Sequence, residues 1–166
     1  MNIIAAADLN WGIGKNNDLL DNIPEDMRFF REKTMNKAVI MGKNTLLSFP
    51  NQKPLPKRLN IVLTRDKDFG CEGAVVCHSI EDAIECAKEI YRDEDIFFIG
   101  GENVYSQAEK VCDTAYITKI ENKYDADRFI LNFDENTDWK IASEEMIKTE
   151  KGIYITFVTY KKIIKD

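Results

Sequence analysis

The sequence lacks the residues that metal centres and disulfide frameworks require. It contains one histidine, His78, and its four cysteines show no Cys-x-x-Cys spacing. Structural zinc sites need clustered cysteine or histidine ligands, and small secreted domains use dense cysteines for disulfides. We therefore expect neither kind of site, and a reduced cytoplasmic compartment suits the chain.

Long apolar runs and an excess of positive charge are also absent. No run approaches the roughly 18 apolar residues that span a bilayer, and the N-terminal segment lacks the basic flank of a signal peptide. The formal net charge of −6 argues against a general nucleic-acid or anionic-membrane binder, but it leaves room for a local basic pocket. The 166 residues are enough for one domain with a substantial core.

Short apolar runs alternate with helical patterns along most of the chain. The predicted strands have the character of parallel strands buried on both faces, and they are Asn2–Asp8, Ala38–Met41, Asn60–Thr64, Ala74–Cys77 and Ile96–Ile99. Helices are predicted from near Pro24, over Ile80–Tyr91 behind a capping box at Ser79, and over Gly101–Val111. This order predicts right-handed crossovers and a mainly parallel sheet covered by helices.

The C-terminal part of the chain follows a different pattern. Thr114–Ile120 and Tyr154–Lys162 contain alternating or β-branched runs with no helix predicted between them. Such runs are typical of antiparallel strands. We expect them to form a closing antiparallel pair at one edge of the sheet.

Two acidic residues, Glu25 and Asp26, follow Pro24, a residue suited to the first position of a helix. At about 100° per residue, one face of this helix carries an apolar stripe made of Ile23, Met27, Phe30 and Thr34. Asp26 lies roughly 60° from the centre of the stripe, at its border, whereas Glu25 points away and is expected in solvent. Position alone leaves both residues as ordinary first-turn acids.

Three predicted strands end on glycine, hydroxyl or cationic residues. They are Gly100–Gly101, the run Gly42-Lys43-Asn44-Thr45, and Thr64-Arg65. The dinucleotide fingerprint G-x-G-x-x-G is absent, and each end alone has the simpler reading of a tight turn or a surface charge. Carboxyl ends of parallel strands meet at one edge of a sheet, so the three together favour one extended, polyanionic ligand.

Several segments in combination resemble bacterial-type dihydrofolate reductases. They are I-I-A-A-A-D, W-G-I-G-K-N-N, I-P-E-D-M-R-F-F, V-I-M-G-K-N-T, P-L-P-K-R-L-N-I-V-L-T-R, F-F-I-G-G-E-N-V-Y and A-Y-I-T-K-I, in that order over essentially the whole chain. The resemblance implies an α/β fold with a predominantly parallel eight-stranded sheet, an antiparallel C-terminal edge and about four flanking helices. It implies a single domain over 1–166, with an adenosine-binding subdomain at roughly 37–93.

The resemblance also implies a reaction and a substrate site. The reaction is hydride transfer from NADPH to C6 of 7,8-dihydrofolate, with protonation at N5, which yields tetrahydrofolate for one-carbon metabolism. Asp26 matches the catalytic acid that holds the pterin, Thr118 the threonine bonded to that acid, and Arg58 the arginine that binds the glutamate α-carboxylate. The apolar walls around the substrate rings would be Ile4, Ala6, Met27, Phe30, Phe49, Leu55 and Ile99.

The cofactor site follows from the same resemblance. The nicotinamide and its ribose would be surrounded by Ala6, Ile13, Gly14, Asn17, Leu19 and Ile99. The pyrophosphate and the adenosine 2′-phosphate would be held by Gly42, Lys43, Asn44, Thr45, Leu63, Thr64 and Arg65, with His78 where the family often has a basic residue. Gly100 and Gly101 match the family's cis Gly-Gly peptide, and the cofactor contacts would continue along Glu102, Asn103, Val104, Tyr105 and Gln107.

Two segments depart from the family's pattern. Asp21 stands where the family usually has a tryptophan; directed inward it would raise the pKa of Asp26 further, but we expect it to face solvent in a loop that packs differently. Asp127, in a variant of the family's Gly-Asp-Thr, still matches the aspartate that docks onto the Gly14 loop. Trp11 and Arg128 match no family role.

Two alternative functions stay open at this point. One is a related riboflavin-pathway reductase acting on a pyrimidine-ribityl substrate, and the other is a binding module that holds NADPH or folate without turnover. Asp26, Arg58 and Thr118 favour the folate enzyme over the first, and an intact Asp26 argues against the second. The partners expected are dihydrofolate and antifolate inhibitors, with no nucleic acid or membrane, and nothing requires more than a monomer.

Overall fold

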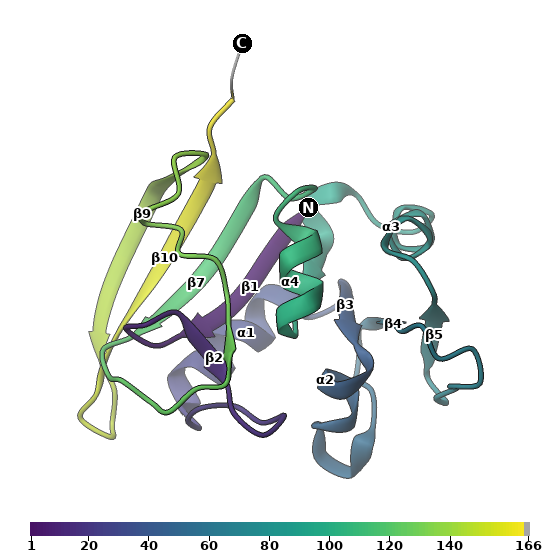
Figure 1. The fold of residues 1–166 in the computed structure, drawn as a ribbon, viewed down its shortest axis with the longest axis horizontal. Coiled ribbons are helices and arrows are strands. Elements are labelled where there is room, and N and C mark those ends of the chain that lie inside the picture. Colours follow the sequence, from purple (N-terminus) through teal and green to yellow (C-terminus); the bar gives the residue numbers. More distant parts are fainter. Residues whose placement is uncertain (165–166) are drawn as a thin grey trace.

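The computed structural model describes residues 1–164 as a twisted eight-stranded sheet flanked by helices (Figure 1). The strands of the chain are β1 Asn2–Ala7, β2 Gly12–Gly14, β3 Ala38–Gly42, β4 Leu59–Leu63, β5 Ala74–Cys77, β6 Ile96–Phe98, β7 Thr114–Ile120, β8 Arg128–Phe129, β9 Trp139–Lys148 and β10 Tyr154–Lys162. The helices are α1 Pro24–Thr34, α2 Lys43–Leu47, α3 Ile80–Lys88 and α4 Glu102–Ala108, with 3₁₀ turns at Pro50–Gln52 and Asp93–Asp95.

The main sheet has the strand order β5-β4-β3-β6-β1-β7-β10-β9. Every pair from β5 to β7 is parallel, which confirms the alternation of strands and helices read from the sequence. Strand β1 lies near the middle and pairs with β6 on one side and β7 on the other. Helix α4 lies in front of the sheet and α1 behind it (Figure 1).

The antiparallel part of the sheet is larger than expected. Strands β7 and β10 form the predicted antiparallel pair, but β9 adds to β10 and is the true edge. Most residues of β9 are exposed, and Trp139 alone is buried. A strand whose side chains face water on both sides lacks the alternating apolar pattern, so β9 could not be recognised from its residues.

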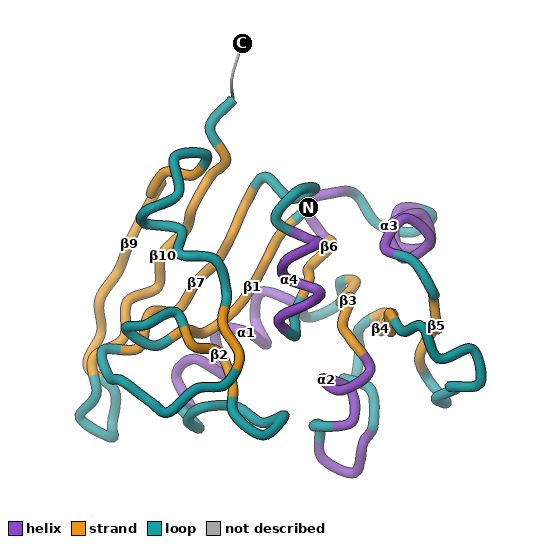
Figure 2. Tube along the Cα trace, viewed as in Figure 1, coloured by secondary structure: helices purple, strands orange, loops and turns teal. Residues whose placement is uncertain are grey.

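Strands β2 and β8 form a separate two-stranded ribbon flanked by loops (Figure 2). These strands are three and two residues long, too short for a periodic pattern, and they were not predicted. Their pairing joins the loop after β1 to the loop after β7. No helix formed by residues 1–164 is long and apolar enough to span a bilayer.

Trp11, which had no assigned role, is a core residue at the start of the loop after β1. Its side chain is 8% exposed, and its ring centroid lies 6.0 Å from Phe133 and 6.4 Å from Tyr160. The Lys119 ammonium sits 5.2 Å from the Trp11 ring centroid. Trp11 thus fixes the base of the loop that leads to β2 by packing it onto the front of the sheet.

We expect Trp11→Ala to lower the free energy of unfolding by about 3–5 kcal/mol, because it removes a large buried ring from a close-packed aromatic cluster. Urea unfolding followed by circular dichroism measures this change. Ile90, which is 68% exposed, provides a control, since Ile90→Ala should change the same quantity by less than about 0.5 kcal/mol. Equal effects of the two substitutions would mean that the cluster does not support the fold.

Candidate active site

A cavity of about 990 Å³ opens at the carboxyl ends of the central parallel strands. It is lined by every residue that the sequence predicted for the cofactor: Ala6, Ile13, Gly14, Asn17, Leu19, Gly42, Lys43, Asn44, Thr45, Leu63, Thr64, Arg65, His78, Ile99, Gly100, Gly101, Glu102, Asn103, Val104, Tyr105 and Gln107. Four further lining residues were missed: Lys15, Asp18, Ser48 and Arg128. The three strand ends that carry glycine, hydroxyl or cationic residues therefore meet in one elongated cavity. The role of each residue stays a prediction.

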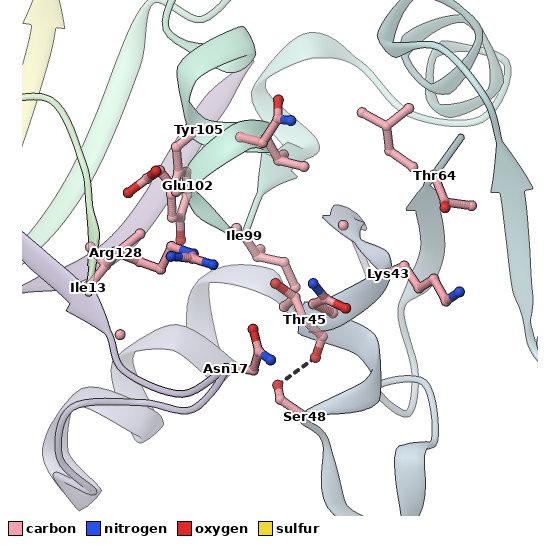
Figure 3. A pocket seen from close by; sticks show the side chains of 18 of the residues that line it. Ile13, Asn17, Lys43, Thr45, Ser48, Thr64, Ile99, Glu102, Tyr105 and Arg128 are labelled. Atoms are coloured by element: carbon pink, nitrogen blue, oxygen red, sulfur yellow. Dashed lines mark hydrogen bonds between the residues drawn. The ribbon is translucent and has the colours of Figure 1, made fainter. Parts of the chain in front are cut away.

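The two ends of the cavity differ in character (Figure 3). Ile13, from β2, lies at one end, and Lys43 and Thr64 lie at the other. At this second end the Lys43 ammonium lies 2.9 Å from a carboxylate oxygen of Asp66. His78 is exposed there, with its Nδ1 2.8 Å from the Thr64 carbonyl oxygen. One end can accept an apolar ring and the other an anionic group.

Glycine backbone forms the floor between the two ends. The Gly100–Gly101 peptide is cis, as the family resemblance implied, and the Gly42 amide donates a 2.8 Å hydrogen bond to the Gly100 carbonyl. Gly100 has φ +120°, and a Cβ there would lie 3.3 Å from the Tyr105 ring. A Cβ on Gly101 would lie 3.7 Å from the Thr45 hydroxyl. Side chains here would occupy the floor, whereas glycine leaves it open to an elongated ligand.

Asp26 lies next to this cavity on the first turn of α1. Burial raises the pKa of its carboxyl group, and a hydrogen bond from Thr118 on β7 acts in the opposite direction. Tyr105, which lines the cavity, is close enough for the Asp26 charge to add to the burial that raises the pKa of the tyrosine. The Tyr105 hydroxyl donates a 2.7 Å hydrogen bond to the Ile4 carbonyl. Asp26 is thus a largely desolvated acid with one fixed hydroxyl partner.

The prediction that Glu25 points into solvent is wrong. One of its carboxylate oxygens accepts a 2.8 Å hydrogen bond from the Glu150 amide, in the turn between β9 and β10. The other oxygen is buried and has no partner among residues 1–164. A helical projection places a side chain relative to its own helix only, so it could not reveal that the hairpin covers this face.

The predicted apolar walls of the substrate site are mostly brought together. One cluster on the α1 side of the sheet contains Ile4, Phe30, Phe49, Leu55 and Ile99. Ala6 packs in a neighbouring cluster around Ile23 and also lines the cavity. Met27 is 50% exposed and joins neither cluster. Met27 is therefore not part of the buried face of α1, whereas Phe29 packs against the core; the predicted contact of Met27 with the substrate stays a prediction.

Arg58 lies beyond α1 with its guanidinium directed at that helix. Its Nη1 donates a 3.1 Å hydrogen bond to the Thr34 hydroxyl, and its Nε donates one of 3.0 Å to the Pro56 carbonyl. Burial, followed by the nearby Arg31 charge, lowers the pKa of Arg58. Within residues 1–164 neither arginine forms an ion pair with a carboxylate. Two adjacent guanidiniums without a counter-ion can receive a carboxylate from a ligand.

Asp21 faces neither solvent nor Asp26, so the expectation of a solvent-facing side chain is wrong. Its side chain is 20% exposed and accepts hydrogen bonds of 2.6 Å from the Tyr124 hydroxyl and 2.9 Å from the Lys151 ammonium. These bonds hold the pKa of Asp21 below its ordinary value. Asp21 joins the segment before α1 to the loop after β7 and to the β9–β10 turn. The absence of the family's usual tryptophan at this position did not indicate that role.

The predicted docking of Asp127 onto the Gly14 loop is confirmed. The Asp127 carboxylate accepts a 3.1 Å hydrogen bond from the Asn16 amide, and its own amide donates one of 3.0 Å to the Gly14 carbonyl. Lys15 forms an ion pair with Asp125 in the same contact. The loop that covers one end of the cavity is therefore held by the loop after β7.

Arg128 follows that contact, and the structure places it on the cavity wall (Figure 3). The neighbouring Phe129 amide donates a 2.6 Å hydrogen bond to Glu102, at the start of α4. The only feature of the sequence that could have indicated this position is that Arg128, a cation, replaces the threonine of the family's Gly-Asp-Thr. The cavity wall thus combines β8, α4 and the Gly14 loop.

Comparison with known proteins gives a consistent result. The family model described as dihydrofolate reductase matches residues 1–162. The dihydrofolate reductase of Bacillus subtilis (strain 168) is 36% identical over 164 residues, which cover 98% of this chain and 94% of the relative. That of Neisseria gonorrhoeae is 38% identical over 160 residues, with 95% of each chain covered. A solved structure of the Enterococcus faecalis dihydrofolate reductase complexed with NADP(H) and RAB-propyl superposes with a TM-score of 0.87, at 29% identity, covering 98% of this chain and 96% of that one.

The contacts of Asp21 generate a prediction for stability against pH. Asp21→Asn should lower the free energy of unfolding at pH 7 by about 1–2 kcal/mol, because it removes a charged acceptor from two hydrogen bonds. A carboxyl whose folded-state pKa is lowered stabilises the protein above its unfolded-state value, here 3.8, and that stabilisation is lost as the pH falls through the folded-state pKa. The difference in the free energy of unfolding between variant and parent should therefore shrink as the pH falls through the folded-state pKa of Asp21.

Urea unfolding at a series of pH values measures the Asp21 effect. Lys151→Met should reproduce the loss at neutral pH, whereas Glu135→Gln, on an exposed acid without an ion pair in residues 1–164, should change little. A loss of stability that does not depend on pH would show that the shape of Asp21, and not its charge, is what matters.

Proposed function

The chain belongs to the dihydrofolate reductase family, and we propose that Asp26 is the catalytic acid of its NADPH-dependent reduction of 7,8-dihydrofolate to 5,6,7,8-tetrahydrofolate. The observation that carries this proposal is the position of one desolvated carboxyl group, hydrogen-bonded to Thr118, beside an elongated cavity with cations at one end. Proton donation near neutral pH needs an acid with a raised pKa, and burial supplies that shift here.

The residues around the cavity fit NADPH. The glycine floor would let the backbone approach the cofactor closely, because no Cβ stands in the way. Lys43, Thr64 and Arg65 would hold its phosphates at the polar end, and Ala6, Ile13 and Ile99 would surround its nicotinamide. Bound there, NADPH supplies the hydride that C6 of dihydrofolate receives. Residues 37–93, which carry the polar end, would form an adenosine-binding subdomain.

Asp26 would hold and protonate the pterin. Its carboxylate can accept hydrogen bonds from the pterin N3 and 2-amino groups, and Thr118 would fix the orientation of that carboxylate. The desolvated site favours binding of a proton, which the acid helps to deliver to N5 while C6 is reduced. The reduced N5–C6 bond thus gains one hydride and one proton, which balances the reaction.

The remaining substrate contacts would fix the other end of dihydrofolate. The apolar cluster of Ile4, Phe30, Phe49 and Leu55 is suited to the benzoyl ring. Arg58, with Arg31 close by and no carboxylate partner within residues 1–164, would bind the glutamate α-carboxylate through its planar fork. We further propose a cytoplasmic monomer that binds small molecules, antifolates included.

Mixing the protein with NADPH and dihydrofolate should deplete the near-ultraviolet absorbance of the reduced nicotinamide. The expected product is tetrahydrofolate, identified by chromatography. A protein that binds both ligands without this depletion would be a non-catalytic binding module, and activity only on a pyrimidine-ribityl substrate would indicate the riboflavin-pathway class. Either outcome would overturn the proposed function.

Asp26→Asn should reduce turnover at neutral pH by about 10²- to 10⁴-fold, because it removes the acid from the reacting centre, while the dissociation constant of NADPH stays unchanged. In the parent enzyme, turnover should fall as the pH rises through the raised pKa of Asp26, and the variant should lack this phase. The variant should also have a higher free energy of unfolding at neutral pH, measured in urea, since an ionised carboxylate no longer has to be buried. Equal losses of turnover and NADPH binding would mean that Asp26 is structural.

A further inference from the structure

One cation of the cofactor cavity, Lys43, is already paired with a carboxylate. Its ammonium lies 2.9 Å from a carboxylate oxygen of Asp66, and both side chains are partly exposed, at 34% and 43%. Asp66 follows directly after Thr64 and Arg65, two residues of the cavity lining. The protein therefore places a negative charge beside the end of the cavity that suits a phosphate.

The position of Asp66 is fixed by its own hydrogen bonds. Its amide donates to the Thr64 hydroxyl at 3.1 Å, and one of its carboxylate oxygens accepts from the Asp68 amide at 3.0 Å. The other oxygen faces Lys43, whose ammonium also lies 5.1 Å from the centroid of the Phe69 ring. The bond from Lys43, followed by that from the Asp68 amide, holds the pKa of Asp66 below its ordinary value, so the carboxylate is ionised at neutral pH.

The other cation at this end is free of such a partner. Arg65 forms no ion pair with any carboxylate of residues 1–164. A phosphate that approaches both cations would find Arg65 available and Lys43 engaged. It would also be repelled by Asp66, because like charges a few ångströms apart disfavour one another even near the surface.

Building on the proposed NADPH-dependent function, we propose that Asp66 is a specificity-determining residue that reduces the enzyme's preference for NADPH over NADH. To bind the 2′-phosphate, Lys43 must share or give up its bond to Asp66, and the phosphate must lie near a fixed carboxylate. NADH has a hydroxyl in place of that phosphate and meets neither cost. A carboxylate can even accept a hydrogen bond from a ribose 2′-hydroxyl, as in sites that prefer NAD.

Asp66→Asn tests the proposal through the dissociation constants of NADPH and NADH, measured by fluorescence titration without dihydrofolate. The substitution should tighten NADPH binding by about 3- to 5-fold and leave NADH unchanged or slightly weaker. Asp68→Asn is the matched control: it removes the same charge two residues further along the chain. The Asp68 side chain forms no ion pair in residues 1–164. It should alter the NADPH-to-NADH ratio by less than half as much.

A Lys43→Met background shows whether Asp66 acts through Lys43. There, the gain from Asp66→Asn should be smaller, because no ammonium remains to be released and only the repulsion between the carboxylate and the phosphate is relieved. Weaker NADPH binding by Asp66→Asn would overturn the proposal and show that Asp66 orients Lys43 for the phosphate. Equal tightening of both dinucleotides would overturn it as well, since the effect would then concern the shared pyrophosphate. Failure of the parent protein to reduce dihydrofolate would contradict the proposed function while leaving this binding ratio measurable.

Discussion

Parallel pairing of β4, β3, β6 and β1 brings four carboxyl ends to one edge of the sheet, and the site is assembled there. Gly42, Thr64 and Gly101 are far apart in the chain, yet all three line one cavity because their strands run in the same direction. Strand β7, which runs parallel to β1, supplies Thr118 from within the sheet. The antiparallel hairpin β9–β10 contributes differently, because its turn supports α1 from outside. The parallel strand ends thus supply much of the cavity lining, and the β2–β8 ribbon adds Ile13 and Arg128 to it.

Three aspartates of this chain illustrate how environment divides one chemical group among different tasks. Burial raises the pKa of Asp26, so it can take part in proton transfer. Hydrogen bonds from cationic and hydroxyl donors lower the pKa of Asp21, which makes it a permanent anion suited to joining segments. Asp66 is a permanent anion as well, but at the mouth of the cavity, where it faces a ligand's charge. The residue type alone distinguishes none of these tasks.

Much of the fold could be predicted because buried parallel strands leave a clear pattern. Ala74–Cys77, Thr114–Ile120 and Tyr154–Lys162 have the predicted bounds, and α1 begins at Pro24 as expected. Strand β9 could not be predicted, since an exposed edge strand needs no apolar alternation. Helix ends were also placed too far along, as at Ile80–Lys88, because the last turn can leave the helix without a change in composition.

The residues of the candidate site could be predicted where they belong to local motifs that match the family pattern. They could not be predicted where contacts between distant segments decide a side chain's environment. The cofactor residues come from strand ends and glycine turns, which are visible in the sequence, and the structure brings them to one cavity. The environments of Glu25 and Asp21 depend on Glu150, Lys151 and Tyr124, more than 100 positions away. No periodicity within α1 carries that information.

The same long separations bear on how the protein is made. The helix that presents Asp26 is synthesised early. Two hydrogen bonds that hold it in place, between Glu25 and Glu150 and between Asp21 and Lys151, span 125 and 130 positions. Strand β1 likewise waits for its neighbours β6 and β7, which come from the second half of the chain. Contacts of such high sequence separation form late and slow folding. Helix α1 can therefore complete these contacts only after the β9–β10 turn has been synthesised.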